Sequence, residues 1–211
     1  QGDWSSDVCS SDLGKVFSFW GLASVTLEDR LGGSMHFNPK ENRFAQNDWG
    51  LRLQTVRTEL FAKTGLNISP DNYIGIQYKY IYHKQSGYIG RRGYNGLEHF
   101  GYFNAIFQHD LTEAHQIKTG ISTQINRVDE TFDTIQLSRM EIVPGAFVEG
   151  SFNVADNKLM IVAGGRIDYH NMFGVFLTPR AHLRWNIIEA LSLKVSAGRG
   201  YRVASVLDRK S

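Results

Sequence analysis

The sequence predicts an all-β protein, an antiparallel transmembrane β-barrel present in part, as roughly nine meander strands of a larger barrel. Three observations predict it: side chains alternate in polarity with a period of two, connections alternate in length, and aromatic residues lie near the ends of the apolar faces. The composition agrees, with 21 Gly, 13 Phe and 9 Tyr but only 4 Pro among 211 residues.

The alternation defines the strands one by one. Between Tyr73 and Lys84 the even positions are apolar or aromatic and the odd positions are mostly polar. Because successive side chains of a strand point to opposite faces, each such segment has one apolar face and one polar face. The predicted strands are 15–27, 51–63, 73–84, 99–109, 116–125, 144–153, 158–170, 177–186 and 191–198.

The connections and the two faces favour a barrel over a half-buried soluble sheet, which would show the same alternation. Links 67–72, 110–114, 154–157 and 187–190 are short, whereas 28–50, 85–98 and 128–140 are long, with a shorter one at 171–174. Outer-membrane barrels have short turns at one side and longer loops at the other. Aromatic residues predicted at the membrane interfaces are Trp185 and Phe107 near the short turns and Tyr82, Tyr169 and Tyr201 near the opposite side.

The polar face is predicted to line a wet lumen. Its charged and polar members are Lys79, Lys118, Arg166, Asp168, Arg180, His182 and Arg184. Either pairing among these charges or steering of anions would fit such a lumen. Arg199 falls on the lipid side by strict alternation, where its side chain would snorkel to the interface.

Three irregularities qualify this interpretation. Pro144 and Pro179 predict bulges or local breaks, because proline removes a ladder donor. The strand 51–63 changes phase, which predicts a bulge near Gln54 or Thr55. Single-chain bacterial barrels have even strand numbers, so about nine strands indicate part of a larger barrel; a closed eight-stranded barrel is the alternative.

Several function classes are excluded or unsupported. Lys+Arg 23 against Asp+Glu 21 gives a net charge of +2, which does not support nucleic-acid binding. No apolar run approaches the ~20 residues of a membrane helix. The seven histidines lack metal-ligand spacing, and Gly198-Arg199-Gly200 is not a dinucleotide fingerprint. We therefore predict no catalytic residues, no metal, no cofactor and no enzyme.

The first 14 residues are predicted to lie outside the fold. The repeat Ser5-Ser6-Asp7 and Ser10-Ser11-Asp12 resembles a translated sequencing adaptor, with a Ser/Asp-rich linker as the alternative. The stretch 1–14 is thus interpreted as an artefactual or disordered leader, and 15–211 as the barrel part. Cys9, the only cysteine, belongs to the leader, so we expect no disulfide or zinc site.

Several segments together resemble the barrel of TonB-dependent outer-membrane receptors, most strongly those of Bacteroidota-type bacteria, over about Lys15 to Asp208. They are Thr178–Trp185, Leu193–Arg202, Arg43–Gly50, Thr58–Gly65, Tyr94–Gly96, Asp129–Phe132 and Glu141–Phe147. The resemblance implies a barrel of about 22 strands with an N-terminal plug. This sequence shows no plug, no TonB-contacting box and no closing strand with an aromatic end.

The resemblance implies uptake of a scarce nutrient, such as a ferric siderophore, a vitamin or a glycan, at the outer membrane. The implied partners are membrane lipid, the TonB complex through the missing plug, the nutrient and a surface lipoprotein. In the long link 85–98, Tyr88, Arg91, Arg92 and Tyr94 combine guanidinium forks with flat rings, which suits an anionic or catecholate ligand. The alternatives are a small closed barrel (adhesin, porin or barrel enzyme) and a soluble β-sheet binding module.

Overall fold

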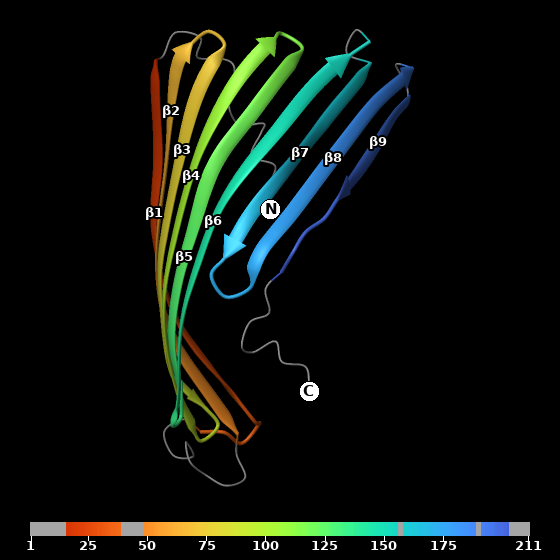
Figure 1. The fold of residues 1–211 in the computed structure, drawn as a ribbon. Helices are drawn as coiled ribbons and strands as arrows, with labels where there is room; N and C mark the ends of the chain where they lie inside the picture. Colours follow the sequence, from red (N-terminus) through yellow and green to blue (C-terminus); the bar gives the residue numbers. More distant parts are fainter. Residues whose placement is uncertain (1–15, 39–48, 156–157, 189–190, 203–211) are drawn as a thin grey trace.

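The computed structural model describes residues 16–38, 49–155, 158–188 and 191–202, which form one open antiparallel sheet (Figure 1). Each strand pairs with the next in the sequence. The all-β meander is therefore confirmed. The strands are β1 (Phe17–Gly33), β2 (Gly50–Ser69), β3 (Asn72–Ile89), β4 (Arg92–Thr112), β5 (His115–Phe132), β6 (Ile135–Val154), β7 (Leu159–His170), β8 (Gly174–Ile188) and β9 (Leu191–Gly198).

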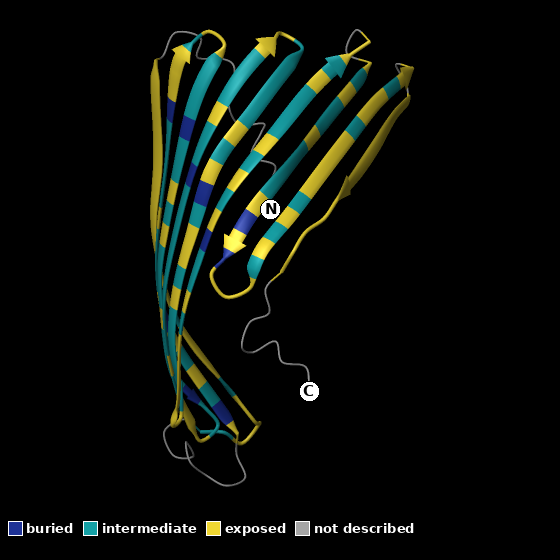
Figure 2. Cartoon of the chain, viewed as in Figure 1, coloured by how far each residue is buried: buried dark blue, intermediate teal, exposed yellow. Residues whose placement is uncertain are grey.

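The ladder registers assign every strand residue to one of two faces. Gln77 pairs with Asn104, which pairs with Ser122, which pairs with Gly145, which in turn pairs with Asp168. Paired residues share a face, so this row defines what we call the inner face. Apart from Tyr88, the buried non-glycine residues of the described ranges all lie on the inner face. They are Thr55, Asn104, Ser122, Val143, Asp168 and His170. This concentration of buried side chains indicates that the inner face is the concave face of the sheet, whose curvature is visible in Figure 2.

The opposite, outer face carries a continuous apolar stripe. On β5 its members are Ile117, Thr119, Ile121, Thr123 and Ile125, and the next outer positions are Arg127 and Asp129. Neighbouring strands change from apolar to polar at nearly the same level. Leu27 of β1 pairs with Val56 of β2 at the end of the stripe, and the next outer pair is Asp29 with Gln54. A barrel strand needs only ~9–11 residues to cross a membrane, whereas β1 to β6 have 17 to 21. These six strands therefore continue well beyond the stripe.

Two of the predicted long loops do not exist as loops. The segments 85–98 and 128–140 continue the strands and end in tight turns at Gly90–Arg91 and Asp133–Thr134. Gly90 has a φ of 60°, which glycine adopts without strain. The prediction was wrong because beyond the stripe both faces become polar, so a strand there resembles a loop in sequence.

The predicted bulge near Gln54 is absent, and the two prolines lie at local breaks in pairing rather than at bulges. Pro144 pairs with Thr123 and Pro179 with Gly165 without a register shift, and β2 stays in register from Leu51 to Asn67. Each proline sits where a ladder ends: β6 pairs with β7 only from Gly145 onward, and β8 with β9 only from Arg180. Backbone contact resumes beyond the break, where the Asn171 N–H donates to the Ile142 carbonyl at 3.2 Å, and the Arg199 N–H donates to the Pro179 carbonyl at 3.0 Å. These are the local breaks that the prolines predict, because proline has no N–H to give to a ladder.

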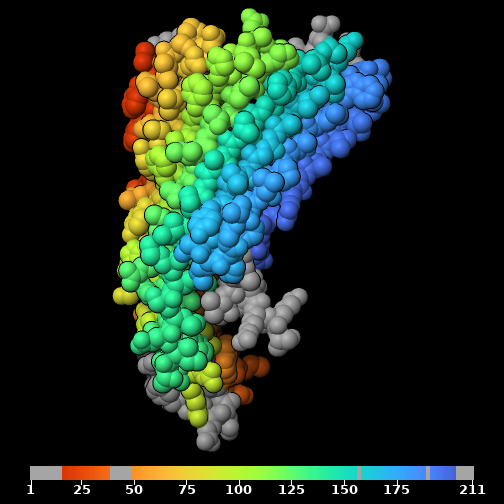
Figure 3. Space-filling view, viewed as in Figure 1, coloured from red at the N-terminus to blue at the C-terminus, as the bar shows by residue number. Residues whose placement is uncertain are grey.

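The sheet has a tall part with long strands, β1 to β6, and a short part, β7 to β9 (Figures 1 and 3). Strands β7, β8 and β9 have 12, 15 and 8 residues, so one end of β6 extends past its neighbour. Asn171 lies directly after β7, where the tall and short parts of the sheet meet. Its Oδ1 accepts from the Ile142 N–H of β6 at 3.1 Å, and its Nδ2 donates to the Met140 carbonyl at 2.9 Å. The side chain thus extends the ladder by one rung. Among the described residues no helix is long and apolar enough to cross a membrane.

Candidate functional site

The inner face brings the predicted lumen residues together. Lys79 lies on β3, Lys118 on β5, Arg166 and Asp168 on β7, and Arg180, His182 and Arg184 on β8. The registers place all seven on the inner face. Strict alternation along unbroken strands produces this arrangement, which is why the sequence could predict it.

Several inner-face charges neutralise one another across strands. Lys79 Nζ lies 2.6 Å from Glu59 Oε1, and Arg57 lies 3.2 Å from the other oxygen of the same carboxylate. Arg180 forms an ion pair with Glu149, and His182 Nδ1 lies 2.9 Å from Ser196 Oγ. These contacts bind adjacent strands while leaving a hydrophilic wall.

The most buried charges on this face are Arg166 and Asp168. Only 3% of the Asp168 side chain is exposed, and the Arg166 guanidinium reaches both carboxylate oxygens at 2.5–2.8 Å. Arg166 also donates to Ser122 Oγ on β5 at 2.6 Å, across the intervening β6. Gly145 of β6 leaves the space for this contact, because a Cβ there would lie 2.0 Å from Asp168 Oδ1.

Tyr201 belongs to this cluster rather than to the outer face. Its ring stacks on Phe176 at 4.1 Å with an interplanar angle of 6°, and Phe176 pairs with Asp168 on the inner face. The prediction that Tyr201 lies at the membrane interface was wrong about its direction. Regular pairing ends at Gly198, so the alternation that placed Tyr201 outward no longer applies.

A second buried group, His170 with Glu141, did not appear among the predicted site residues. His170 is 2% exposed, its Nδ1 accepts from the Met172 N–H at 3.2 Å, and its Nε2 lies 3.9 Å from Glu141 Oε2. Glu141 is also 2.9 Å from Arg139. The sequence signal available was the two-residue spacing of Asp168 and His170, which places both on one face but does not reveal their partners.

The inner face of β8 and β9 has an excess of positive charge. Within the described part of the chain, Arg184 and Lys194 have no ion-pair partner, and the two residues pair directly across the strands. Arg180 and His182 lie on the same face of β8. A tract of this kind attracts anions.

The four residues predicted as a ligand-binding loop do not lie in a loop. Tyr88 is the last but one residue of β3, Arg91 is in the turn, Arg92 is the first residue of β4 and Tyr94 is its third. Tyr88 pairs with Gly93 whereas Tyr94 pairs with Gly87, so the two rings point to opposite faces. The two rings therefore cannot contact one ligand from the same face, and ligand binding by these four residues stays a prediction.

The inner-facing members of that hairpin still make a defined polar and aromatic group. The Tyr94 hydroxyl donates to Glu130 at 3.0 Å, and the Arg92 guanidinium lies 5.7 Å from the centre of the Phe132 ring. Burial, and then the Glu130 carboxylate, raise the pKa of Tyr94 to about 12. Both residues lie beyond the level at which the apolar stripe ends.

The other four predicted interface aromatics lie on the outer face. Tyr82 is at the polar end of the stripe, with its ring 5.4 Å from that of His99, and Tyr169 is 54% exposed near the β7–β8 turn. Phe107 and Trp185 lie toward the short turns of the other end. Their contact with a membrane interface stays a prediction.

No group of three or more His, Cys, Asp or Glu side chains within the described ranges is placed to hold a metal ion. Cys9 and the predicted leader 1–14 lie outside those ranges. The chemistry that the inner face offers is reversible contact through guanidinium, carboxylate, imidazole and phenol groups.

Comparison with solved structures identifies the fold. The structure matches the alcaligin outer membrane receptor FauA from Bordetella pertussis with a TM-score of 0.57 at 16% identity, covering 81% of this chain and 31% of that one. Weaker matches are the ferric citrate transporter FecA, with a TM-score of 0.48 at 9% identity, and the siderophore receptor PirA from Pseudomonas aeruginosa, with 0.43 at 9%. They cover 70% and 75% of this chain and 28% and 37% of the two transporters.

The chain thus spans about a third of the length of these structures, which are transport receptors rather than enzymes. No curated protein matches the sequence. The family model described as "TonB dependent receptor-like, beta-barrel" matches residues 3–211, nearly the whole chain. With the nine-stranded meander and its two chemically distinct faces, this match shows that the chain belongs to the TonB-dependent receptor β-barrel family.

Proposed function

We propose that this chain forms part of the barrel wall of an outer-membrane receptor for TonB-dependent active uptake of a scarce nutrient, such as a ferric siderophore, a vitamin or a glycan. The observation that carries the proposal is the division between the faces: an apolar stripe of uniform height outside and paired polar groups inside. Family membership supports it.

The outer face is unsuited to water. Large side chains along it are about half exposed, for example Ile121 at 60%, Val195 at 51% and Leu193 at 45%. A contiguous exposed apolar surface of this kind marks a contact with lipid or protein. The stripe spans a height that fits the apolar band of a barrel, ~25 Å.

The inner face supplies a surface for a polar nutrient. The Arg92, Tyr94 and Glu130 group lies near the tip of the β3–β4 hairpin, and the basic tract of Arg180, Arg184 and Lys194 lies toward the other end. A ligand bearing carboxylates or catecholates would contact guanidiniums and rings at the tip and meet positive charge deeper in the barrel. Tyr88 and Arg91 join this proposal as rim residues.

The partners in the proposal are outer-membrane lipid, the TonB complex reached through a plug domain, the nutrient and a surface lipoprotein. Both the plug and the remaining barrel strands would come from polypeptide other than these 211 residues. The family to which the chain belongs supports uptake as the proposed activity.

A matched pair of lysine substitutions on β5 tests the membrane assignment. Ile121 lies outward at the middle of the stripe and Gln124 lies inward, and both are exposed. In lipid, Ile121→Lys should cost about 2–4 kcal/mol and sharply reduce the heat-modifiable outer-membrane band, whereas Gln124→Lys should leave it unchanged. Equal behaviour of the two variants, with the protein in the soluble fraction, would instead support the soluble β-sheet module.

Uptake itself is tested in cells carrying the complete gene. The probes are radioactive iron loaded on citrate or on a catecholate siderophore, labelled vitamin B12 and a labelled maltodextrin. One of them should accumulate in a manner that disappears on deletion of TonB. Accumulation independent of TonB would point to a passive porin.

A further inference from the structure

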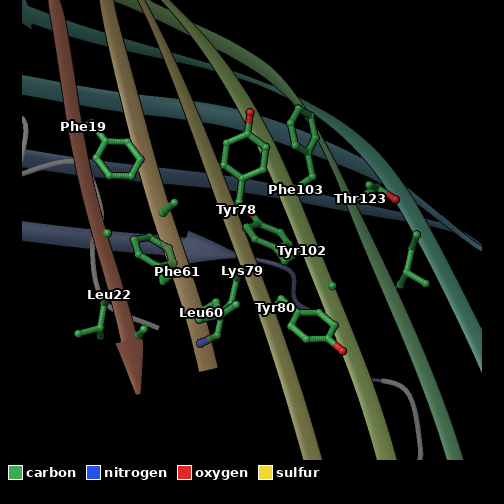
Figure 4. Close-up of a pocket in the computed structure, with 15 residues that line it drawn as sticks. Phe19, Leu22, Leu60, Phe61, Tyr78, Lys79, Tyr80, Tyr102, Phe103 and Thr123 are labelled. Atoms are coloured by element: carbon green, nitrogen blue, oxygen red, sulfur yellow. The ribbon is translucent and has the colours of Figure 1, made fainter. Parts of the chain in front are cut away.

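The outer face is hollowed where β1 to β5 cross the middle of the apolar stripe (Figure 4). The groove has a volume of about 770 Å³ and is lined almost entirely by apolar atoms. It follows two neighbouring rows of paired residues. One row runs from Gly21 through Ala62, Tyr78 and Phe103 to Thr123, and the other from Ala23 through Leu60, Tyr80 and Gly101 to Ile125.

Residue size explains the hollow. Gly21, Ala23, Ala62 and Gly101 provide the floor, because their side chains do not rise above the sheet. Phe19, Tyr78 and Phe103 rise around them, with the Tyr78 and Phe103 rings 5.5 Å apart. Leu22, Phe61, Lys79 and Tyr102 alternate with these positions and face inward, so their backbone completes the floor.

One end of the groove leads to basic side chains. The Tyr80 hydroxyl lies 2.9 Å from His99 Nδ1, and His99 pairs with Arg127 on the outer face. Arg127 lies two residues beyond Ile125 of the groove, a rise of about 7 Å. Arg127 forms an ion pair with Asp129, whose Oδ2 accepts from Nε at 2.9 Å; this is its only hydrogen bond within the described residues, so both terminal nitrogens can donate further. Lys84, exposed on the same face, makes no ion pair within the described ranges.

We propose that this groove holds one acyl chain of a phosphorylated membrane lipid, with the phosphate near Arg127 and Lys84. The inference rests on the proposed function in one respect, that the outer face contacts lipid. The hollow shape favours a flexible chain over a second copy of the protein, because two identical hollows facing each other would leave a void. A guanidinium and an ammonium beyond an apolar groove match the order of groups in such a lipid.

The structure supplies a variant that fills the groove without disturbing the sheet. A Cβ on Gly101 would have no heavy atom nearer than the Ile125 carbonyl oxygen, at 3.9 Å. Gly101→Leu therefore places a side chain in the groove. Gly165→Leu is the matched control, because Gly165 lies on the outer face of β7, away from the groove, and has nothing within 4 Å of its Cβ position.

The experiment measures lipid retained in detergent by the receptor expressed from the complete gene, by native mass spectrometry after addition of dioleoylphosphatidylglycerol or dioleoylglycerol. Wild type and Gly165→Leu should retain the phosphorylated lipid at least five-fold more than Gly101→Leu. The double variant Lys84→Gln/Arg127→Gln should keep acyl-chain binding but lose the preference for phosphatidylglycerol. All variants should show heat-modifiable gel migration, which confirms that they fold.

Equal retention by Gly101→Leu and Gly165→Leu would overturn the proposal. So would a dimer in the wild type that Gly101→Leu abolishes, since the groove would then bind a second copy. Because the readout uses no nutrient, a chain that fails every uptake assay can still retain lipid. Conversely, a chain that transports but retains no lipid would contradict only this inference.

Discussion

The tall part of the sheet, β1 to β6, and the short part, β7 to β9, share the apolar stripe but differ in what lies beyond it. In the tall part, hairpins continue past the stripe and are held by unbroken ladders and polar pairs such as Arg52 with Asp29 at 2.7 Å. In the short part, the chain turns back at the end of the stripe, and Asn171 joins the turn to β6. Every strand is thus long enough to cross the apolar stripe, and hairpins extend beyond it where polar contacts hold them.

The largest effect is expected where the two parts are joined through Arg166 and Asp168. Asp168→Ala leaves a half-buried guanidinium without its carboxylate, which should cost about 3 kcal/mol, the lower end expected for a broken buried pair. The temperature at which the folded band disappears on gels should fall markedly. The double variant Arg166→Met/Asp168→Ala should recover much of the loss. A double variant as unstable as the single one would show that the loss does not come from the unpaired Arg166 guanidinium.

A smaller effect is expected at Asn171, where the tall and short parts of the sheet meet. Asn171→Ala removes two side-chain hydrogen bonds to β6, each worth roughly 0.5–1.5 kcal/mol. Hydrogen exchange of the Ile142 amide should accelerate by about ten-fold, because this N–H donates to the Asn171 Oδ1. Asn95→Ala, on the exposed outer face of β4 in the tall part, should leave exchange of Ile142 unchanged. Unaltered exchange in Asn171→Ala would mean that the two parts are held together there by other contacts.

The ionisation of Tyr94 tests the packing near the β3–β4 turn, at the end of the tall part. The pKa of Tyr94 is raised to about 12, first by burial and then by Glu130, so the fold favours the neutral phenol. Its stabilising contribution is complete below pH 10 and is lost as the pH rises from about 10 to about 12. Glu130→Gln should lower the pKa of Tyr94 without returning it to 10, because burial remains. Ultraviolet difference spectra against Tyr94→Phe measure this, and a Tyr94 that ionises near 10 would exclude a packed tip.

The smallest effect concerns the exposed carboxylates of the tall hairpins. Hydrogen bonding by Arg52 lowers the pKa of Asp29, and hydrogen bonding by Ser138 lowers that of Asp129. Their contribution is present above the ordinary aspartate pKa of 3.8 and is lost as the pH falls below it. Between pH 6 and pH 3, wild type should lose slightly more stability than Asp29→Asn/Asp129→Asn. An identical loss in both would mean that these pairs contribute nothing.

The sequence by itself determined which side chains share a face. Lys79, Lys118 and Asp168 could be assigned to one side, and Tyr82 and Trp185 to the other, because strand geometry allows only two directions. The class and family followed from the same alternation and from recurring segments such as Thr178–Trp185.

Only the tertiary structure decided how long the strands are, which charges meet and where alternation stops. The tall hairpins could not be recognised in the sequence because polarity no longer alternates beyond the stripe. The prolines produced local breaks without shifting the register of the strands with which they pair. Tyr201 turned inward once pairing ceased at Gly198. Each of these depends on the neighbouring strand, and a pattern along a single strand carries no information about where its neighbour ends.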